Sequence, residues 1–178
     1  MWLVKGGEII MSSTFTPTDG YMKKVKLKRI TEKDDLAKLT KELNAAAWDK
    51  ANDIKGYSEK YVSEFVENTD NILLVAYMRG KVAGVCLASK NYAPYKDNES
   101  WLFVDEVDVS ADYRRQGIGK TMMEKLFEIG REMGLPEAWV GTEPDNDAAN
   151  HLYKSLAPSE IENCIGYTYK LNKNKSLK

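Results

Sequence analysis

The sequence is poor in the residues that build disulfide frameworks and metal sites. It contains two cysteines, Cys86 and Cys164, and one histidine, His151, in 178 residues. Disulfide scaffolds and zinc clusters need several such side chains at short spacings, so this pattern argues against both and no metal site is predicted. Each cysteine lies in or directly at the start of a predicted strand, where we expect a small core residue in a reducing compartment. We expect His151 at the surface.

The sequence also lacks long apolar runs and a large net charge. No run approaches the ~18 apolar residues of a membrane span, and the apolar start at residues 2–4 is shorter than the roughly 7 to 15 residues of a signal-peptide core. A formal net charge of -1 provides no general attraction to nucleic acid or to an anionic membrane. We therefore expect a cytoplasmic protein that binds neither.

The residues that are present fit one globular domain. Hydrophobic residues make up 43% and charged residues 30% of the chain, enough for one core and a solvated surface. Residues 1–21 show neither a helical nor a strand period and end in a stretch rich in turn residues, so we expect a poorly packed, disordered N-terminal arm. We place the single domain at residues 22–172 and a frayed basic tail at residues 173–178.

Hydrophobic periodicity predicts an alternation of strands and helices along this domain. Strands are predicted at residues 24–29, 71–78, 81–90, 101–109, 138–142 and 165–171. Helices are predicted at residues 36–47, 58–66, 118–133 and 147–156. Thr31 with Asp34 is the N-cap signature of the first helix, and Arg79-Gly80 is a hairpin turn. This order predicts an α/β fold in which helices cover a mixed sheet.

The strand at residues 101–109 is the most informative part of the chain. It is apolar at its start and acidic towards its end, and it is followed by the helix from Ile118 and the strand at residues 138–142. These three elements form a right-handed βαβ unit. Because ligands of such sheets bind at the carboxyl ends of parallel strands, Gly117 is placed at a ligand site.

Three kinds of phosphate-binding loop compete for the glycine-rich turn after this strand. A Walker A loop needs a glycine where Arg114 stands, although Gly119, Lys120 and Thr121 match its end. A dinucleotide-binding fingerprint needs a third glycine where Met122 stands. Both interpretations are therefore disfavoured. What remains is the pattern Arg/Gln-x-x-Gly-x-Gly/Ala directly after an acidic strand.

Through this pattern, the segment from Val107 to Gly119 resembles the GNAT superfamily of N-acetyltransferases. The block from Glu143 to Lys154 is similar to the family's Asn-x-x-Ala-x-x-x-Tyr segment, while Ala157-Pro158 stands where the family usually has Gly-Phe. Both blocks also look similar to small aminoglycoside and streptothricin acetyltransferases. The resemblance implies a mixed, mostly antiparallel sheet with a central, splayed pair of parallel strands and with helices on both faces.

The glycine turn is expected to hold acetyl-CoA, the cosubstrate that the resemblance implies. Free backbone N–H groups over residues 115–120 would bind the pyrophosphate at a helix start, whose dipole adds roughly 0.3 to 1 kcal/mol. By resemblance, the backbone of Val107 and Val109 pairs with the pantetheine arm, and a bulge near Val107 opens the gap beside it. The predicted cofactor-binding residues are Val107, Val109, Arg114, Arg115, Gln116, Gly117, Ile118, Gly119, Lys120, Thr121, Asn146 and Tyr153. The alternative for Asn146 is a helix cap.

Acetyl transfer to an amine needs a base, because an amine with a pKa of ~10.4 is protonated at neutral pH. Asp105, Glu106 and Asp108 crowd the end of the acidic strand, where alternation places Glu106 and Asp108 on one face and Asp105 on the other. Glu106 is the first choice for the base, acting through a water; the alternative is that all three are exposed strand-end charges. By resemblance, Tyr153 is the general acid that protonates the leaving thiolate. The alternative is that Tyr153 is an aromatic residue that only packs in the core.

These residues predict an acetyl-CoA-dependent N-acetyltransferase that moves an acetyl group to a primary amine by direct transfer through a ternary complex. The acidic acceptor side favours a small cationic amine or a protein amine. In the family, the acceptor is read by the regions at residues 45–67 and 91–100. An aminoglycoside-type antibiotic acetyltransferase and a non-catalytic acyl-CoA-binding domain are the alternatives. The exposed last strand could pair in a homodimer.

Overall fold

The computed structural model describes residues 4–5, 8–9, 25–49, 56–94 and 100–171. Its strands are β1 (Val4–Lys5), β2 (Glu8–Ile9), β3 (Lys26–Ile30), β4 (Asn71–Met78), β5 (Lys81–Tyr92), β6 (Ser100–Val109) and β7 (Ala138–Val140). Its α-helices are α1 (Leu36–Asn44), α2 (Glu59–Glu67), α3 (Ile118–Glu132) and α4 (Asp147–Lys154), with a short 3-10 helix, η2, at Ala111–Tyr113.

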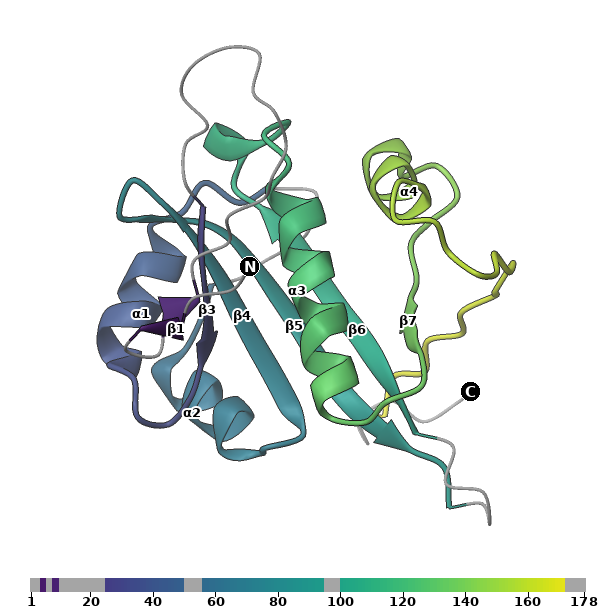
Figure 1. Cartoon of the computed structure of the whole chain (residues 1–178), viewed down its shortest axis with the longest axis horizontal. Coiled ribbons are helices and arrows are strands. Elements are labelled where there is room, and N and C mark those ends of the chain that lie inside the picture. The colour runs from purple at the N-terminus through teal and green to yellow at the C-terminus, as the bar shows by residue number, and fades with distance from the viewer. Residues whose placement is uncertain (1–3, 6–7, 10–24, 50–55, 95–99, 172–178) are drawn as a thin grey trace, which may run out of the picture.

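Five strands form one mixed sheet in the order β3-β4-β5-β6-β7 (Figure 1). Neighbouring strands are antiparallel except for β6 and β7, which are parallel. The predicted hairpin joins β4 to β5, and both of its turn residues, Arg79 and Gly80, have positive φ angles of 54° and 74°. Two successive positive φ angles are typical of the tight turns that suit the right-handed twist of paired strands.

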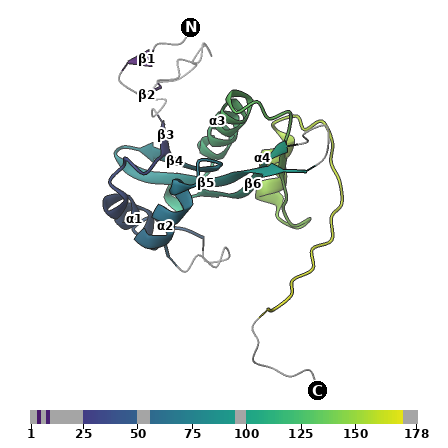
Figure 2. The same ribbon diagram turned by 90° about the horizontal axis from the view of Figure 1, so that it is seen from below.

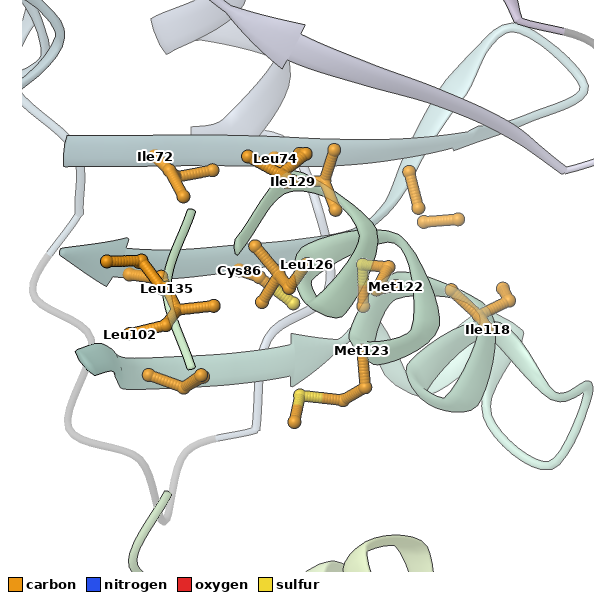
Figure 3. Close-up of a cluster of buried hydrophobic side chains, with 14 of the residues drawn as sticks. Ile72, Leu74, Cys86, Leu102, Ile118, Met122, Met123, Leu126, Ile129 and Leu135 are labelled. Atoms are coloured by element: carbon orange, nitrogen blue, oxygen red, sulfur yellow. The ribbon is translucent and has the colours of Figure 1, made fainter. Parts of the chain in front are cut away.

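Helices cover the two faces of this sheet in separate layers (Figure 2). Helix α3 lies on one face, where its buried side chains pack with those of β4, β5 and β6 (Figure 3). Helices α1 and α2 lie on the opposite face, over a second core cluster. The labelled core residues of the α3 face are Ile72, Leu74, Cys86, Leu102, Ile118, Met122, Met123, Leu126, Ile129 and Leu135. The predicted α/β fold with helices on both faces is therefore confirmed.

The start of α1 differs from the prediction. Asp35 caps the helix by accepting a hydrogen bond from the Lys38 N–H at 2.9 Å. Thr31 and Asp34 form a separate turn before it, in which the Thr31 N–H donates to Asp34 Oδ2 at 2.9 Å. An aspartate directly before the apolar period is as good a cap as Thr31, and the sequence pattern alone does not separate the two.

The predicted last strand is wrong for the described residues. Residues 165–171 are not paired with any strand, and their side chains are exposed. Cys164 is exposed as well, so only Cys86 is the small core residue that we expected. Because no described strand pairs with the other side of β7, the parallel pair β6–β7 lies at the edge of the described sheet and not at its centre. A β-rich pattern predicts a strand, but a strand forms only where an open edge receives it.

Little of the predicted N-terminal arm and basic tail belongs to the described part of the chain. Val4–Lys5 and Glu8–Ile9 form a small antiparallel pair within residues 1–21, and the rest of that arm, like residues 173–178, lies outside the described residues. Across the described ranges, no helix combines the length and the apolar character needed to cross a membrane.

Candidate active site

A bulge in β6 sets the direction of the acidic side chains. The register of β5 against β6 shifts between Leu87, which pairs with Glu106, and Ala88, which pairs with Val104. Asp105 is therefore the extra residue on the β6 side. We predicted a bulge near Val107, and the structure has it two residues earlier. A bulge reverses the alternation of side chains beyond it, since two residues then oppose one.

This reversal moves Glu106 and Asp108 to the face covered by α1 and α2. Before the bulge, Val104 packs into the α3 core. Strict alternation would send Glu106 and Asp108 into that same apolar core. After the bulge, Val107 points there instead, and the two acids pair across the strands with Leu87 and Val85 of the opposite core cluster. The prediction that Glu106 and Asp108 share a face is confirmed.

Glu106 and Asp108 lie next to each other and are called the acid pair below. Asp108 is only 5% exposed. Burial, followed by a hydrogen bond to Asp108 and by the charges of Asp108 and Asp105, raises the pKa of Glu106 to about 8. The neutral form of Glu106 is favoured because two neighbouring carboxylates in a poorly solvated site repel each other when both are ionised. These acids are thus not ordinary exposed strand-end charges.

Asp105 stands apart from this pair. It is exposed at the bulge and accepts a hydrogen bond from the Ser89 hydroxyl at 3.3 Å. The part of its side chain that is covered by the protein raises its pKa, while the bond from Ser89 lowers it. Its negative charge raises the pKa of Glu106. Asp105 therefore belongs to the electrostatic surroundings of the acid pair, on the outside of the strand.

Tyr57 is a site residue that the sequence interpretation did not single out. Its hydroxyl oxygen is buried and forms no hydrogen bond within the described part of the chain. Burial raises the pKa of Tyr57, and the negative charges of Glu106 and Asp108 raise it further. Its ring lies 6.2 Å from that of Trp48. The region predicted to read the acceptor therefore supplies two aromatic rings on the face that carries the acid pair.

The strands β6 and β7 separate at the level of the acids. Their parallel pairing covers Leu102 to Val104 on β6, opposite Ala138 to Val140 on β7, and β7 then ends. Among the residues that the structure describes, no strand lies beside the β6 backbone from Asp105 to Val109 on the β7 side. This edge provides backbone donors and acceptors next to the acid pair, as the predicted gap requires.

The turn after β6 leads into α3 through a glycine. Gly117 is the N-cap of α3 with a φ angle of 76°, and Arg115 before it has a φ angle of 62°. The first N–H of the helix that finds an acceptor is that of Thr121, which donates to Gly117 O at 3.0 Å. Across the described residues, the backbone N–H groups of residues 115–120 form no hydrogen bond. The predicted row of free amides at a helix start is therefore present in the structure.

Several side chains of this turn have structural roles. The Arg114 guanidinium lies 2.8 Å from Asp49 Oδ2, and its Nε donates to Val109 O at 3.3 Å. The Thr121 hydroxyl donates to Gly117 O at 3.1 Å. Arg114 and Thr121 thus hold the turn in shape. Arg115, Gln116 and Lys120 are exposed, whereas the Ile118 side chain is buried in the core.

The second glycine of the motif serves helix packing. A Cβ atom at Gly119 would lie 3.1 Å from Leu152 Cδ2 of α4 and 3.6 Å from Val109 Cγ2. By contrast, a Cβ atom at Gly117 would meet nothing within 4 Å. Gly117 is therefore required for its backbone conformation, and Gly119 for the close approach of α4 to the start of α3.

Helix α4 carries the remaining predicted residues. Asn146 caps it, because its side-chain oxygen accepts a hydrogen bond from the Ala149 N–H at 3.1 Å. The side-chain oxygen of Asn146 therefore has the helix-cap role that was the alternative to cofactor binding. Tyr153 is half-buried and packs against the α3-face core. Burial, followed by the charges of Cys86 and Asp108, raises the pKa of Tyr153 to about 12. Its hydroxyl therefore keeps its proton at neutral pH. His151 is exposed.

A groove lies beside Tyr153, between α3, β7 and the chain that follows α4. It encloses about 400 Å³. Its lining is largely apolar and includes Leu102, Val104, Met123, Phe127, Val140, Tyr153 and Leu156. The acid pair and the glycine turn do not line it. Within the described ranges, no group of three or more His, Cys, Asp or Glu side chains is arranged to hold a metal ion.

Comparison with known proteins relates this arrangement to a family. The model of the acetyltransferase (GNAT) family matches residues 37–157. The L-2,4-diaminobutyric acid acetyltransferase of Shouchella clausii is 31% identical over 134 residues, covering 72% of this chain and 71% of that protein. An uncharacterized N-acetyltransferase of Methanocaldococcus jannaschii is 26% identical over 115 residues, or 64% of this chain. The chain spans about half the length of this second relative, 50%.

Solved structures show the same fold. An aminoglycoside acetyltransferase from an uncultured soil metagenomic sample, in complex with trehalose, matches with a TM-score of 0.72. The match covers 83% of this chain and 97% of that chain at 22% sequence identity, so it concerns the fold alone. Since the family model spans most of the sheet, the glycine turn and α4, the chain belongs to the acetyltransferase (GNAT) family.

Proposed function

We propose that the chain is an acetyl-CoA-dependent N-acetyltransferase that moves an acetyl group directly to a primary amine within a ternary complex. The observation that carries this proposal is the row of free amides over residues 115–120, which opens α3 beside the unpaired edge of β6. A helix start with unsatisfied N–H groups favours phosphate oxygens. Arg115 and Lys120 are exposed at the same turn and add positive charge.

The unpaired edge of β6 supports a position of the pantetheine arm of acetyl-CoA alongside this strand. Its amide-containing chain can pair with the backbone of Val107 and Val109 as an added strand would. This pairing would bring the thioester to the level of the acid pair. A β6 amide at this position could then stabilise the oxyanion that forms when the amine attacks the thioester carbonyl.

The acid pair supplies a carboxylate that can accept the proton of the attacking amine. The amine nitrogen forms a bond to the carbonyl carbon, the carbon–sulfur bond breaks, and the nitrogen loses a proton to the Glu106 carboxylate, directly or through a water. The coenzyme A thiolate takes a proton from the Tyr153 hydroxyl. With a pKa of about 8, Glu106 is a base whose strength is close to that needed near neutral pH, although most of it is protonated at pH 7.

The acceptor that best fits these surroundings is a small cationic amine. Two carboxyl groups and the rings of Tyr57 and Trp48 share one face of the sheet. Carboxylates and aromatic faces both attract ammonium groups. The Shouchella clausii relative is named for L-2,4-diaminobutyric acid, a small diamine. A diamino acid of this size is therefore the first acceptor to try.

Calorimetry and a thiol-release assay test this function. We expect coenzyme A to bind the full chain, and acetyl-CoA to release free thiol with at least one amine from a panel of 2,4-diaminobutyrate, a polyamine, an aminoglycoside and a peptide with a free N-terminus. Binding without thiol release on any amine would support the non-catalytic acyl-CoA-binding alternative. An aminoglycoside as the preferred acceptor would support the antibiotic-modifying alternative.

A Tyr153→Phe substitution tests the role of the acid separately. We expect kcat to fall by about 100-fold while the affinity for acetyl-CoA stays unchanged, because the hydroxyl acts on the leaving thiolate. Tyr77→Phe is the matched control, since burial also raises the pKa of Tyr77 to about 12 on the other side of the sheet. An unchanged kcat for Tyr153→Phe would exclude this tyrosine as the acid.

A further inference from the structure

The chain that directly follows α1, residues 45–49, is bonded to the glycine turn and is called the α1 extension below. The Ala111 N–H, at the start of η2, donates to Ala47 O at 2.8 Å. The Arg114 guanidinium lies 2.8 Å from Asp49 Oδ2. One backbone hydrogen bond and one ion pair therefore connect the α1 extension to the turn that leads into α3.

The η2 side of this connection is fixed on the sheet. Ser110, directly before η2, is 1% exposed, and its N–H donates to Ala83 O of β5 at 3.0 Å. Arg114 is bonded to the end of β6, because its Nε donates to Val109 O at 3.3 Å. A guanidinium with a partner on two sides fixes the distance between these partners, since its donors form a rigid planar fork. The α1 extension therefore takes its position from the end of β6.

The α1 extension carries one of the two aromatic rings on the face of the acid pair. Trp48 Nε1 donates to Leu43 O at 2.7 Å, and the Trp48 ring lies 6.2 Å from the Tyr57 ring. Both rings pack against the core cluster beneath α1 and α2. Burial, followed by the charges of Glu106 and Asp108, raises the pKa of Tyr57. The two rings are therefore close enough to the acid pair to be affected by its charge.

The Tyr57 ring is attached to the end of α1 in a different way. The Asn44 side chain donates to Tyr57 O at 2.9 Å and accepts from the Tyr57 N–H at 2.7 Å. Gly56, with a φ angle of 99°, leaves room for this pair of bonds, since a Cβ atom there would lie 3.2 Å from Asn44 Oδ1. Tyr57 therefore depends on α1 alone, whereas the chain around Trp48 depends on the glycine turn as well.

The ion pair between Arg114 and Asp49 adds little to stability by itself. The two side chains are 45% and 35% exposed. Water and salt weaken ion pairs at such exposure. The contact therefore affects where the α1 extension lies more than whether the chain folds.

We propose that Arg114 is a positioning residue for the acceptor amine, because through Asp49 it holds the Trp48 ring beside the acid pair. The sequence predicts Arg114 as a cofactor-binding residue. In this proposal its guanidinium serves the acceptor side, while Arg115 and Lys120 supply the positive charge for the pyrophosphate. The inference rests on the proposed function, in which the acceptor binds beside these rings. A displaced Trp48 ring would attract an ammonium group less well, without any change in the free amides of the turn.

The affinity for the amine tests this role. Asp49→Ala removes the ion pair and leaves the bond from Arg114 to Val109 O in place. For the preferred amine of the panel above, KM and the dissociation constant in the presence of coenzyme A should both rise roughly 3- to 10-fold, while kcat and the coenzyme A affinity stay within about twofold. Glu64→Ala is the matched control, since it removes the exposed ion pair with Lys60 on α2 and should change none of these quantities.

Conservative variants separate positioning from local packing. Asp49→Glu keeps the carboxylate and should restore most of the amine affinity that Asp49→Ala loses. Arg114→Lys keeps the positive charge but not the planar fork, so it should also raise KM for the amine. In the double variant Asp49→Ala/Arg114→Lys the two effects should not add, because both substitutions break the same contact.

The indole N–H signal of Trp48 tests the contact without any acetyl transfer. Because this N–H is bonded to Leu43 O, its chemical shift reports the position of the ring. In spectra of the full, ¹⁵N-labelled chain, with the signal assigned by Trp48→Phe, it should move in Asp49→Ala and in Arg114→Lys and stay in place in Glu64→Ala.

The outcomes distinguish this inference from the proposed function. Thiol release by the original chain, together with an unchanged amine affinity in Asp49→Ala, would overturn the positioning role alone. An unshifted Trp48 signal in both Asp49→Ala and Arg114→Lys would overturn it whether or not the chain transfers acetyl groups. Absence of thiol release on every amine, with a Trp48 signal that moves as expected, would contradict the proposed function and support the contact.

Discussion

The glycine turn and the acid pair lie at the end of the same strand, β6, yet they are built in opposite ways. The turn presents backbone amides, and its side chains at Arg115 and Gln116 are exposed. The acid pair presents side chains, and Asp108 is almost fully buried. A site made of backbone depends on the conformation of the chain, whereas a site made of buried carboxyl groups depends on residue identity and on pH. Substitutions that change the backbone should therefore affect the turn, and substitutions that change a carboxyl group should affect the acid pair.

The largest effect is expected for Glu106→Gln. The amide cannot accept the amine proton, so kcat/KM should fall by roughly 100- to 1,000-fold, while acetyl-CoA affinity stays unchanged. In the unsubstituted protein, kcat/KM should rise with pH through an apparent pKa near the value of about 8 given by burial and Asp108. Steady-state rates measured from pH 6 to pH 9 check both expectations.

Asp105→Asn is the control for this substitution, since Asp105 lies outside the acid pair and bonds to Ser89. We expect it to change kcat/KM by less than about fivefold. If Asp105→Asn removed the activity and Glu106→Gln did not, the roles of the two acids would have to be exchanged.

The same Glu106→Gln substitution should change the pH dependence of stability. The pKa of Glu106 is raised from 4.5 to about 8 in the folded chain. The folded state therefore holds this proton more tightly than the unfolded state, and stability is lost as pH rises through this window. Denaturant unfolding at pH 5 and pH 8 should show that the free energy of unfolding falls with rising pH more steeply for the original chain than for the variant. Equal pH dependence of the two proteins would contradict the raised pKa of Glu106.

A smaller effect is expected when the backbone of the turn is disturbed. Gly117 and Gly134 lie at opposite ends of α3, with φ angles of 76° and 72° and open space around both. Replacement of either by valine should cost about 1 to 2 kcal/mol of stability because valine disfavours positive φ. Only Gly117→Val should weaken coenzyme A binding, by roughly 10- to 50-fold. Equal affinities for the two variants, by calorimetry, would argue against a cofactor at this turn.

Much of the fold could be predicted from the sequence, because the strands and α3 repeat their apolar residues with a clear period. The hairpin at Arg79-Gly80 and the buried face of α3 are examples. The position of the bulge could not be predicted, because a single extra residue such as Asp105 leaves the composition of the strand unchanged. The strand expected at residues 165–171 has the right pattern, but its formation depends on an edge that the pattern does not specify.

The parts of the site also differ in how far the sequence predicts them. The free amides at residues 115–120 could be predicted, since a local glycine motif at a helix start determines them. Tyr57 could not, because the charges of Glu106 and Asp108 that act on its hydroxyl come from residues far away in the chain. Its neighbours along the chain have no periodic pattern to mark it. A buried tyrosine hydroxyl without a partner becomes visible only when the chain is folded.

The smallest expected effect concerns Tyr57. Tyr57→Phe removes a buried hydroxyl that lacks a hydrogen bond, so the free energy of unfolding should rise by up to about 1 kcal/mol. If this hydroxyl positions the acceptor, KM for the amine should rise roughly 5- to 10-fold with little change in acetyl-CoA affinity. Tyr61→Phe on exposed α2 surface is the control and should change neither quantity. An increase in stability without a change in KM would assign Tyr57 to packing alone.

An NMR titration of the full, ¹⁵N-labelled chain with coenzyme A tests the central claim most directly. The amide signals of residues 115–120 should show the largest shifts and should saturate together with the calorimetric binding curve. Saturable binding that leaves these six amides unshifted, or the absence of binding to a folded chain, would contradict the assignment of this turn to the cofactor pyrophosphate.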